Sequence, residues 1–234
     1  LIVGEEKYEM TKEHSWGVFD YYSICRKLER ENVRYSFEVQ SGEEVLYFNR
    51  YGVTEKIEPV YDFVIVPGFS TPDWAKGAVM YQIYTDRFYN GDPSNDVENR
   101  EYYYIGDYST KVDDWDKYPA AMGVREFYGG DLQGVIDKLD YLKDLGVEVI
   151  YFNPLFVSLS NHKYDIQDYD YIDPHFGKIV EDGGEVLPEG VKENHLATKY
   201  QKRVTDKKNL KASNELFVKL VEELHKRGMR IILD

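Results

Sequence analysis

Clusters of β-forming residues mark the first seventy positions of the chain. Residues 35–39 (Tyr-Ser-Phe-Glu-Val) and 45–48 (Val-Leu-Tyr-Phe) alternate or group such residues, and Ser41 and Gly42 lie between them as a turn. A third cluster, residues 63–66, is followed by the breaking residues Pro67, Gly68 and Pro72. The pattern predicts a small β domain over residues 1–72 and a domain boundary near Pro72.

A different pattern follows this boundary. Residues 79–84 are typical of a buried strand, and residues 147–152 and 229–234 are two more apolar, strand-sized segments. Each of the last two comes after a stripe of apolar residues at helical spacing, over 132–145 and 216–224, and after a glycine, Gly146 or Gly228. Two successive helix, glycine, strand units predict an α/β fold with a parallel sheet and crossover helices over residues 73–234.

Parallel α/β sheets carry their chemistry where the strands end. Functional residues are therefore expected at three places: the loop after Tyr84, the loop after Phe152, and Asp234 itself. The first of these loops reaches Gly130, which is longer than an ordinary connection and is typical of a functional or a disordered loop.

Charge and composition narrow the possible partners. The 234 residues include 29 Lys and Arg against 43 Asp and Glu, which gives a formal charge of −14. This balance argues against nucleic acid as a partner, because tracking phosphates needs clustered cations. The longest apolar runs are far shorter than the roughly 20 residues that span a bilayer, so we expect no membrane span.

The N-terminal residues and the cysteine content do not determine the cellular compartment of the protein. The first eight residues lack the features of a signal peptide and do not begin with Met, so we expect that Leu1 is not a natural N-terminus. Cys25 is the sole cysteine, which excludes an intrachain disulfide but places the protein in neither an oxidising nor a reducing compartment. The chain also has 22 tyrosines, whose rings suit interfaces or sugars.

Residues 90–96 (Asn-Gly-Asp-Pro-Ser-Asn-Asp) form the first candidate site. Asn90, Asp92, Asn95 and Asp96 offer four oxygen-bearing side chains within seven residues, an arrangement that suits a hard cation with 6 to 8 oxygen ligands. The spacing is not that of an EF-hand. Composition alone favours the alternative, a turn rich in Asn and Asp that holds no ion.

Residues 161–165 (Asn-His-Lys-Tyr-Asp) and 170–177 form the second candidate site. His162 and Tyr164 are placed to grip a substrate, with the tyrosine ring as a platform. A packed loop with both side chains satisfied internally fits the spacing equally well. Metal binding by His162 and His175 is disfavoured, because no HExxH or HxH spacing accompanies them.

Two further places in the sequence are candidates, one for a site residue and one for a helix N-cap. Asp234 follows a buried strand, where a carboxylate usually belongs to a site or a network. Gly129, Gly130 and Asp131 read as a tight turn into a helix with Asp131 as its N-cap. The GxGxxG, P-loop and GxSxG motifs are absent from the sequence, which removes the usual nucleotide and serine-hydrolase signatures.

Several strings in the second half of the chain together resemble the α-amylase family, glycoside hydrolase family 13. The resemblance is strongest to its neopullulanase, cyclomaltodextrinase and maltogenic amylase branch. The strings are Pro-Asp-Trp (72–74), Val-Met-Tyr-Gln-Ile-Tyr-Thr-Asp-Arg-Phe (79–88), residues 90–96, Phe-Tyr-Gly-Gly-Asp-Leu-Gln-Gly (127–134), 146–154, Ser-Asn-His-Lys-Tyr-Asp (160–165), Asp-Pro-His-Phe-Gly (173–177) and Arg-Gly-Met-Arg-Ile-Ile-Leu-Asp (227–234).

The resemblance implies a fold and a metal. Residues 73–234 would supply the first three strands of a (β/α)8 TIM barrel, truncated after strand three, and residues 1–72 part of an all-β sandwich domain of starch-binding type. A structural Ca²⁺ would be bound by six residues of the first loop and the Gly-Gly-Asp turn, namely Asn90, Asp92, Asn95, Asp96, Gly129 and Asp131.

The resemblance also implies an activity. The expected substrate is an α-glucan or maltooligosaccharide, cleaved at α-1,4 glucosidic bonds, with α-1,6 bonds as a further candidate, by a retaining mechanism with two carboxylates. His162 and Tyr164 would contact sugar and Asp234 would support them. None of the family's three catalytic carboxylates matches a residue of this segment, so we expect that residues 1–234 alone do not hydrolyse glucans. Non-catalytic carbohydrate binding and α-glucan transfer are the alternatives, and relatives suggest a homodimer.

Two segments depart from the branch. Residues 97–126 separate the two halves of the expected calcium site, and residues 178–211 follow Gly177, where the family soon enters a helix. We expect both insertions on the active-site face of the barrel.

Overall fold

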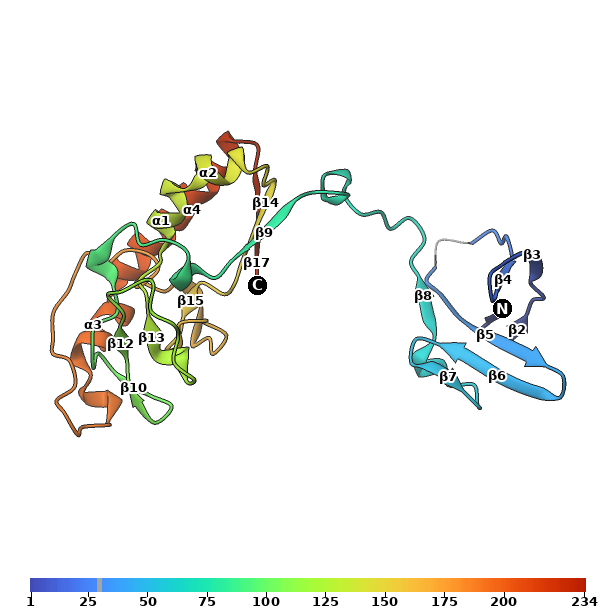
Figure 1. Cartoon of the computed structure of the whole chain (residues 1–234), viewed down its shortest axis with the longest axis horizontal. Helices are drawn as coiled ribbons and strands as arrows, with labels where there is room; N and C mark the ends of the chain where they lie inside the picture. Colours follow the sequence, from blue (N-terminus) through green and yellow to red (C-terminus); the bar gives the residue numbers. More distant parts are fainter. Residues whose placement is uncertain (29–30) are drawn as a thin grey trace. The chain divides into compact units, whose positions relative to one another are not determined.

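The computed structural model describes residues 1–28 and 31–234 and divides into two compact units, Leu1–Lys76 and Gly77–Asp234 (Figure 1). The division lies between Lys76 and Gly77, where the sequence predicted a boundary near Pro72. Within the described part of the chain, none of the helices combines the length and the apolar character that crossing a membrane requires.

The first unit is built from short strands. Six of them form a sheet in the order β2-β1-β5-β6-β7 with β8 paired to β5, and the other two form a separate antiparallel hairpin, β3 with β4. Their bounds are β1 (Ile2–Val3), β2 (Glu6–Lys7), β3 (Thr11–Trp16), β4 (Phe19–Ser23), β5 (Val33–Ser41), β6 (Glu44–Asn49), β7 (Gly52–Thr54) and β8 (Phe63–Ile65).

The hairpin β5–β6 and the strand β8 confirm the three strands predicted here. Gly42 makes the turn between β5 and β6 with φ at +63°, a conformation that costs other residues energy. The hairpin β3–β4 was not predicted, because Thr11–Trp16 is a largely polar run without alternating apolar residues.

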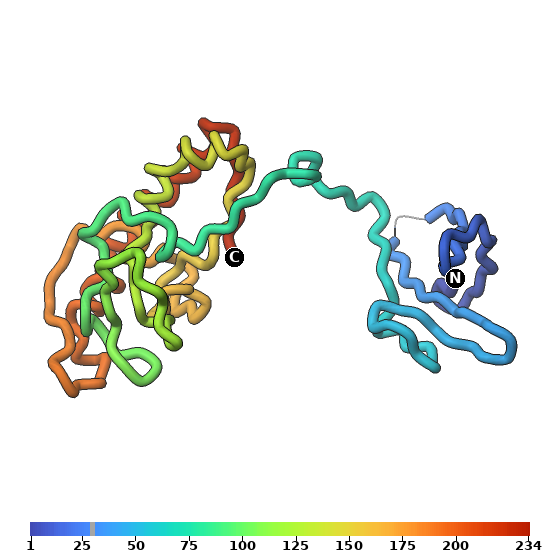
Figure 2. Tube along the Cα trace, in the orientation of Figure 1, coloured from blue at the N-terminus to red at the C-terminus, as the bar shows by residue number. Residues whose placement is uncertain are grey.

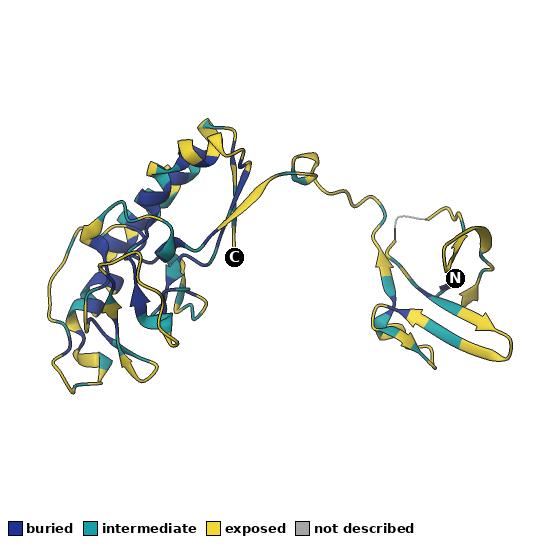
Figure 3. Cartoon of the chain, viewed as in Figure 1, coloured by how far each residue is buried: buried dark blue, intermediate teal, exposed yellow. Residues whose placement is uncertain are grey.

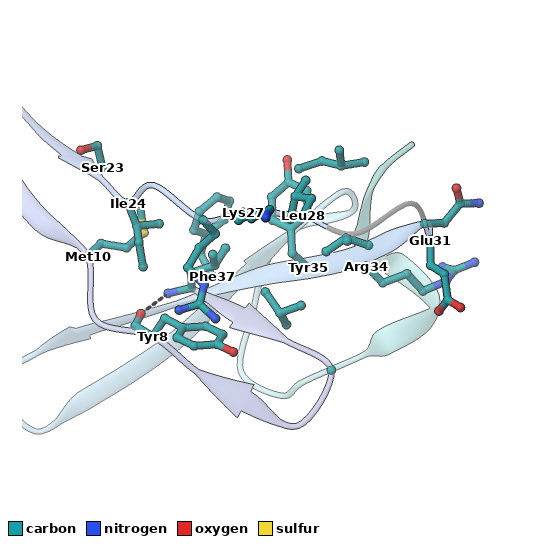
Figure 4. A pocket seen from close by; sticks show the side chains of 17 residues that line it. Tyr8, Met10, Ser23, Ile24, Lys27, Leu28, Glu31, Arg34, Tyr35 and Phe37 are labelled. Atoms are coloured by element: carbon teal, nitrogen blue, oxygen red, sulfur yellow. Dashed lines mark hydrogen bonds between the residues drawn. The ribbon is translucent and has the colours of Figure 1, made fainter. Parts of the chain in front are cut away.

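Aromatic rings hold the main sheet of the first unit together. Tyr35, Phe37, Phe48 and Phe63 lie with ring centroids 5.3–6.3 Å apart. Much of this unit is nevertheless exposed (Figure 3). A pocket of about 770 Å³ opens beside β1 and β5, where the Leu1 amino group donates to the Tyr8 carbonyl (Figure 4). None of the residues predicted to bind calcium or sugar lines it.

The second unit contains the predicted parallel sheet. Its strands are β9 (Met80–Ile83), β10 (Tyr103–Tyr104), β11 (Asp107–Tyr108), β12 (Thr110–Lys111), β13 (Glu126–Phe127), β14 (Val149–Phe152), β15 (Phe156–Val157), β16 (Asp168–Ile172) and β17 (Arg230–Leu233), and its helices are α1 (Leu132–Asp137), α2 (Leu139–Asp144), α3 (Thr198–Thr205) and α4 (Lys207–Lys226).

Strands β17, β14 and β9 lie side by side in that order and are parallel, with Ile150 opposite both Tyr81 and Ile231. Gly146 and Gly228 end the preceding helices with φ at +89° and +69°. The predicted α/β class is therefore confirmed. The sheet stays open, and the described residues contain no closed barrel.

Two helix predictions need correction. The helix predicted over 132–145 is two helices that meet at Lys138, whose amide donates to the carbonyl of Val135, three residues back instead of four. The helix predicted over 216–224 is the second half of α4, which begins at Lys207 because Asp206 caps it through the Lys208 amide. The end of the 178–211 insertion is therefore the first turn of α4.

Side chains from α1, α2 and α4 pack against the sheet in one apolar core. Leu132, Leu142, Ile150, Phe152 and Leu220 are fully buried there. The same helices connect the strands, so the three strands run in one direction and end at one edge of the sheet.

The two insertions pack on each other and form a second apolar core. Figure 2 shows residues 97–126, in green, beside residues 178–211, in orange. The Leu187 amide donates to the Arg100 carbonyl at 2.7 Å, and the Asn194 side chain exchanges two 2.8 Å hydrogen bonds with the Tyr103 backbone. The long segment after Tyr84, which reads as polar, thus contains β10 to β13 and the buried Tyr102.

Candidate functional site

The carboxyl ends of β14 and β17 bring three predicted sugar-binding residues together. The Asp234 amide donates to the Phe152 carbonyl at 3.1 Å, which aligns the two strand ends. The Tyr164 hydroxyl donates to the Asp234 carboxylate, and the His162 and Tyr164 rings lie 5.8 Å apart. A phenol, an imidazole and a carboxylate therefore share one edge of the sheet.

Tyr164 combines exposure with a fixed orientation. Its side chain is 54% exposed, while the hydrogen bond to Asp234 raises the pKa of its hydroxyl to about 12. The Tyr164 amide donates to His162 Nδ1 at 3.1 Å, so the two side chains are also tied through the backbone. An exposed ring beside polar groups suits a sugar, whose apolar face stacks and whose hydroxyls hydrogen-bond.

Lys163 anchors the loop between these two residues. Its side chain is 1% exposed, and its ammonium group lies 2.6 Å from Asp173 and 2.8 Å from the Ser158 carbonyl. Its φ of +61° is rare for a residue with a side chain. The buried ion pair thus holds a backbone reversal that leaves His162 and Tyr164 on the outer side.

A network of hydrogen bonds and ion pairs extends from Asp173 into both insertions. Asp173 accepts from His175 Nδ1 at 2.9 Å, His175 Nε2 lies 2.7 Å from Glu101, and Glu101 accepts from Arg203 at 2.9 Å. Burial alone would lower the pKa of His175, but the charges of Glu101 and Asp173 outweigh it and raise that pKa to about 9. His175 is therefore an imidazolium held between two carboxylates, and both of its nitrogens are engaged.

The sequence pattern did not indicate this network: it places His175 in the second candidate segment and disfavours it as a metal ligand. The signal near it was Asp173, two residues before the histidine and next to a proline turn. Glu101 and Arg203 lie far from it in sequence, so no spacing links them.

The six residues predicted to bind calcium lie together as well. Asn90 donates to Asp96 at 2.8 Å, and a Cβ atom added at Gly129 would lie 2.5 Å or less from both side chains. Asn95 donates to Asp131 at 3.3 Å, and the Asp92 amide donates to Asp131 at 2.8 Å. The loop 90–96 is thus wrapped around the Gly-Gly-Asp turn.

Asp131 organises this loop in addition to capping α1. One carboxylate oxygen accepts from the Gly134 amide, at 2.6 Å, and from the Gly91 amide, while the other accepts from Asp92 and Asn95. The predicted N-cap is confirmed. Burial raises the pKa of Asp131 to about 6, although its backbone partners act in the opposite direction.

Two buried oxygens at this loop have no hydrogen-bond partner among the described residues. They are Oδ1 of Asn90 and Oδ1 of Asn95, and Asn95 is fully buried. Such atoms call for a partner such as a cation or water. Among residues 1–28 and 31–234, no group of three His, Cys, Asp or Glu side chains converges as a metal site. The donors assembled here include two asparagines, which such a group leaves out, and their hard oxygen chemistry fits Ca²⁺.

The sequence pattern did not predict a structural role for Asp86. This residue is 1% exposed, accepts from the Tyr128 amide at 3.1 Å and from the Gly129 amide, and pairs with Arg87 at 2.8 Å. Burial raises the pKa of Asp86 to about 6 against the opposite effect of Arg87. Asp86 thus fastens the end of β9 to the Gly-Gly-Asp turn.

Two family models match the chain, both of them from α-amylases. The N-terminal ig-like domain matches residues 3–65 and the catalytic domain matches residues 82–196. The second match contains the Asn90–Asp96 loop and the residues His162 and Tyr164.

Individual proteins and a solved structure show the same similarity. The chain is 41% identical to a cyclomaltodextrinase of Thermoanaerobacter pseudethanolicus over 72% of this chain and 28% of that protein. It is 36% identical to neopullulanase 2 of Thermoactinomyces vulgaris over 92% of this chain and 30% of that protein. A solved cyclomaltodextrinase matches with a TM-score of 0.51 at 31% identity, over 96% of this chain and 31% of that one.

The chain therefore spans less than a third of the length of these curated relatives. Across that length, both of its units match: the first to the Ig-like domain and the second to the catalytic domain. The chain belongs to the α-amylase family.

Proposed function

We propose that this chain is part of an α-glucan-acting glycoside hydrolase that cleaves α-1,4 glucosidic bonds, with α-1,6 bonds as a second target, by a retaining mechanism. The observation that carries the proposal is the cluster of His162, Tyr164 and Asp234 at the carboxyl edge of a parallel sheet. This edge is where such folds bind ligands, and His162 and Tyr164 lie within the match to the catalytic domain.

Each member of this cluster has a distinct part. The exposed Tyr164 ring stacks on a glucose unit, and Asp234 fixes its orientation through the hydroxyl group. His162 Nδ1 is engaged by the Tyr164 amide, so Nε2 is the atom offered to a sugar hydroxyl. The nucleophile and the acid/base belong to later strands of the same domain, as the resemblance implies.

The complete protein tests this proposal with maltoheptaose as substrate. Tyr164→Ala removes the stacking surface, and we expect KM to rise at least tenfold, about 1.4 kcal/mol. Tyr169→Ala is the matched control, because Tyr169 is 70% exposed on β16 and lies outside the cluster. Products longer than the substrate would identify a transferase, and binding without cleavage would identify a non-catalytic carbohydrate-binding protein. Equal KM values for both variants would reject the role of Tyr164.

We also propose that Asn90, Asp92, Asn95, Asp96, Gly129 and Asp131 bind a structural calcium ion. Two observations support this assignment: the two buried amide oxygens that find no partner in the described part of the chain, and the absence of a side chain at Gly129. When bound, the ion would neutralise the carboxylates and hold the loop 90–96 to the Gly-Gly-Asp turn. These residues bind and orient the loop and take no part in bond cleavage.

Chelation tests the calcium assignment. We expect EDTA to lower the melting temperature of the chain and Asp92→Ala to abolish that effect. Asp114→Ala is the matched control, because Asp114, like Asp92, accepts a hydrogen bond from the amide two residues on and lies outside the calcium set. A melting temperature that EDTA leaves unchanged in the unaltered chain would reject the assignment.

A further inference from the structure

One of the insertions places a cation beside the proposed calcium residues. Lys111, on β12, lies with its ammonium nitrogen 2.9 Å from Oδ2 of Asp96. The other carboxylate oxygen of Asp96 accepts from Asn90. Both oxygens of this carboxylate, which is 6% exposed, are therefore occupied by groups of the chain itself.

Lys111 is held in this position by its backbone. Its amide donates to the Asn99 side chain at 2.9 Å, and β12 pairs in parallel with β13, which ends two residues before Gly129. The side chain is 36% exposed, whereas its partner is buried. A buried carboxylate without a partner is costly, so Lys111 stabilises Asp96 when no ion is present.

We propose that Lys111 is an internal cation that occupies Asp96 in the absence of calcium and that calcium displaces when it binds. This inference rests on the proposed calcium site and adds its regulation. A divalent ion bound by Asp96 would repel an ammonium group that lies 2.9 Å from the same carboxylate. Calcium binding therefore includes the cost of moving Lys111 away, and the loop 90–96 depends less on calcium than it would without the lysine.

Titration of the full chain with CaCl₂ tests the inference by calorimetry. Lys111→Met removes the competing charge, and we expect calcium to bind at least tenfold more tightly. Lys111→Arg keeps the charge and should bind calcium as the unaltered chain does. Lys117→Met is the matched control, since Lys117 lies in the same insertion and pairs at 2.8 Å with Glu126, outside the calcium set.

Melting temperatures give a second readout. In EDTA, Lys111→Met should melt at a lower temperature than the unaltered chain, and saturating CaCl₂ should raise its melting temperature by more. Equal calcium affinity in the unaltered chain, Lys111→Met and Lys117→Met would overturn the role of Lys111 and leave the calcium site standing. If neither the unaltered chain nor Lys111→Met binds calcium at millimolar concentration, the calcium proposal fails, and the role of Lys111 with it.

If Lys111→Met fails to fold, amine labelling of the unaltered chain tests whether calcium displaces Lys111. Acetic anhydride should modify Lys111 faster in CaCl₂ than in EDTA, because the displaced ammonium group becomes free, while the rate at Lys117 should not change. A Lys111 rate that calcium leaves unchanged would overturn the inference.

Discussion

At the scale of single residues, the glucan-binding proposal depends on a strained lysine. Lys163 adopts a left-handed conformation that costs about 1 kcal/mol for a residue with a side chain. Its ion pair with Asp173 is buried on both sides, at 1% and 0% exposure, and holds that conformation. Burial would raise the pKa of Asp173, but Lys163 and His175 lower it well below its usual range. Buried charges thus orient the loop that carries His162 and Tyr164.

The protonation of His175 gives a prediction about pH. The pKa of His175 is raised to about 9 in the folded chain and is about 6.5 when unfolded, so its contribution to stability is complete below pH 6.5 and is lost as pH rises through 9. Glu101 and Asp173 are the charged groups that face the ring, and Tyr200 stacks on it. We expect His175→Gln to lower the free energy of unfolding by up to about 3 kcal/mol at pH 6, and by less at pH 9.5.

Urea unfolding at both pH values measures this difference, and NMR titration of the imidazole measures the pKa directly. His195→Gln is the control, because His195 is exposed. A titration midpoint near 6.5 for His175, or an equal effect of His175→Gln at both pH values, would contradict the prediction.

At the scale of elements, the approach of the Gly-Gly-Asp turn to the end of β9 decides the geometry of the proposed calcium site. A Cβ atom on Gly130 would lie 2.0 Å from the Thr85 carbonyl oxygen, so only glycine fits there. The Gly130 amide donates to the Asp86 carbonyl at 3.0 Å. The start of α1, capped by Asp131, is therefore fixed against the end of the first parallel strand.

We predict that Gly130→Ala separates these elements. The clash is with backbone, which cannot turn aside, so the variant should lose several kcal/mol of stability and its response to calcium. Gly123→Ala is the control, because its Cβ would meet nothing closer than 3.5 Å. Thermal melts with and without CaCl₂ compare the two, and a Gly130→Ala chain that melts like Gly123→Ala would show that the turn tolerates a side chain.

At the scale of the second unit as a whole, the two insertions, residues 97–126 and 178–211, pack together around one apolar core. Leu187 is fully buried in a core that also contains Tyr102 and Phe127. Arg203 links the two insertions further, because its guanidinium group donates to Glu101, to Asp182 and to the Asp96 carbonyl. Residues 97–126 and 178–211 therefore support both the proposed calcium loop and the proposed sugar-binding loop.

A substitution in one insertion should accordingly loosen the other. Leu187→Ala leaves a cavity and should cost about 2–5 kcal/mol. Hydrogen exchange should then speed up at the amides of Tyr103 and Ser109, in the opposite insertion, as well as around residue 187. Leu196→Ala, at a side chain that is 48% exposed in the same insertion, is the control. Faster exchange confined to residues 178–211 would show that the insertions are independent.

The sequence by itself determined the parts that depend on local pattern. Apolar spacing with Gly146 and Gly228 predicts the parallel sheet, because helix period and left-handed glycine caps are local properties. The cap at Asp131 and the strand end at Asp234 follow in the same way. The break at Lys138 and the early start of α4 at Lys207 were missed, since packing and capping contacts decide helix ends.

Only the tertiary structure decided what joins these parts. It brings Glu101 and Arg203 to His175, and Lys111 to Asp96, across separations in sequence that no motif encodes. It also shows the two insertions sharing one core, although each appears in the sequence as a polar interruption. The physical reason is that buried charges need partners wherever the fold can supply them, and those partners are set by the packing of the whole unit.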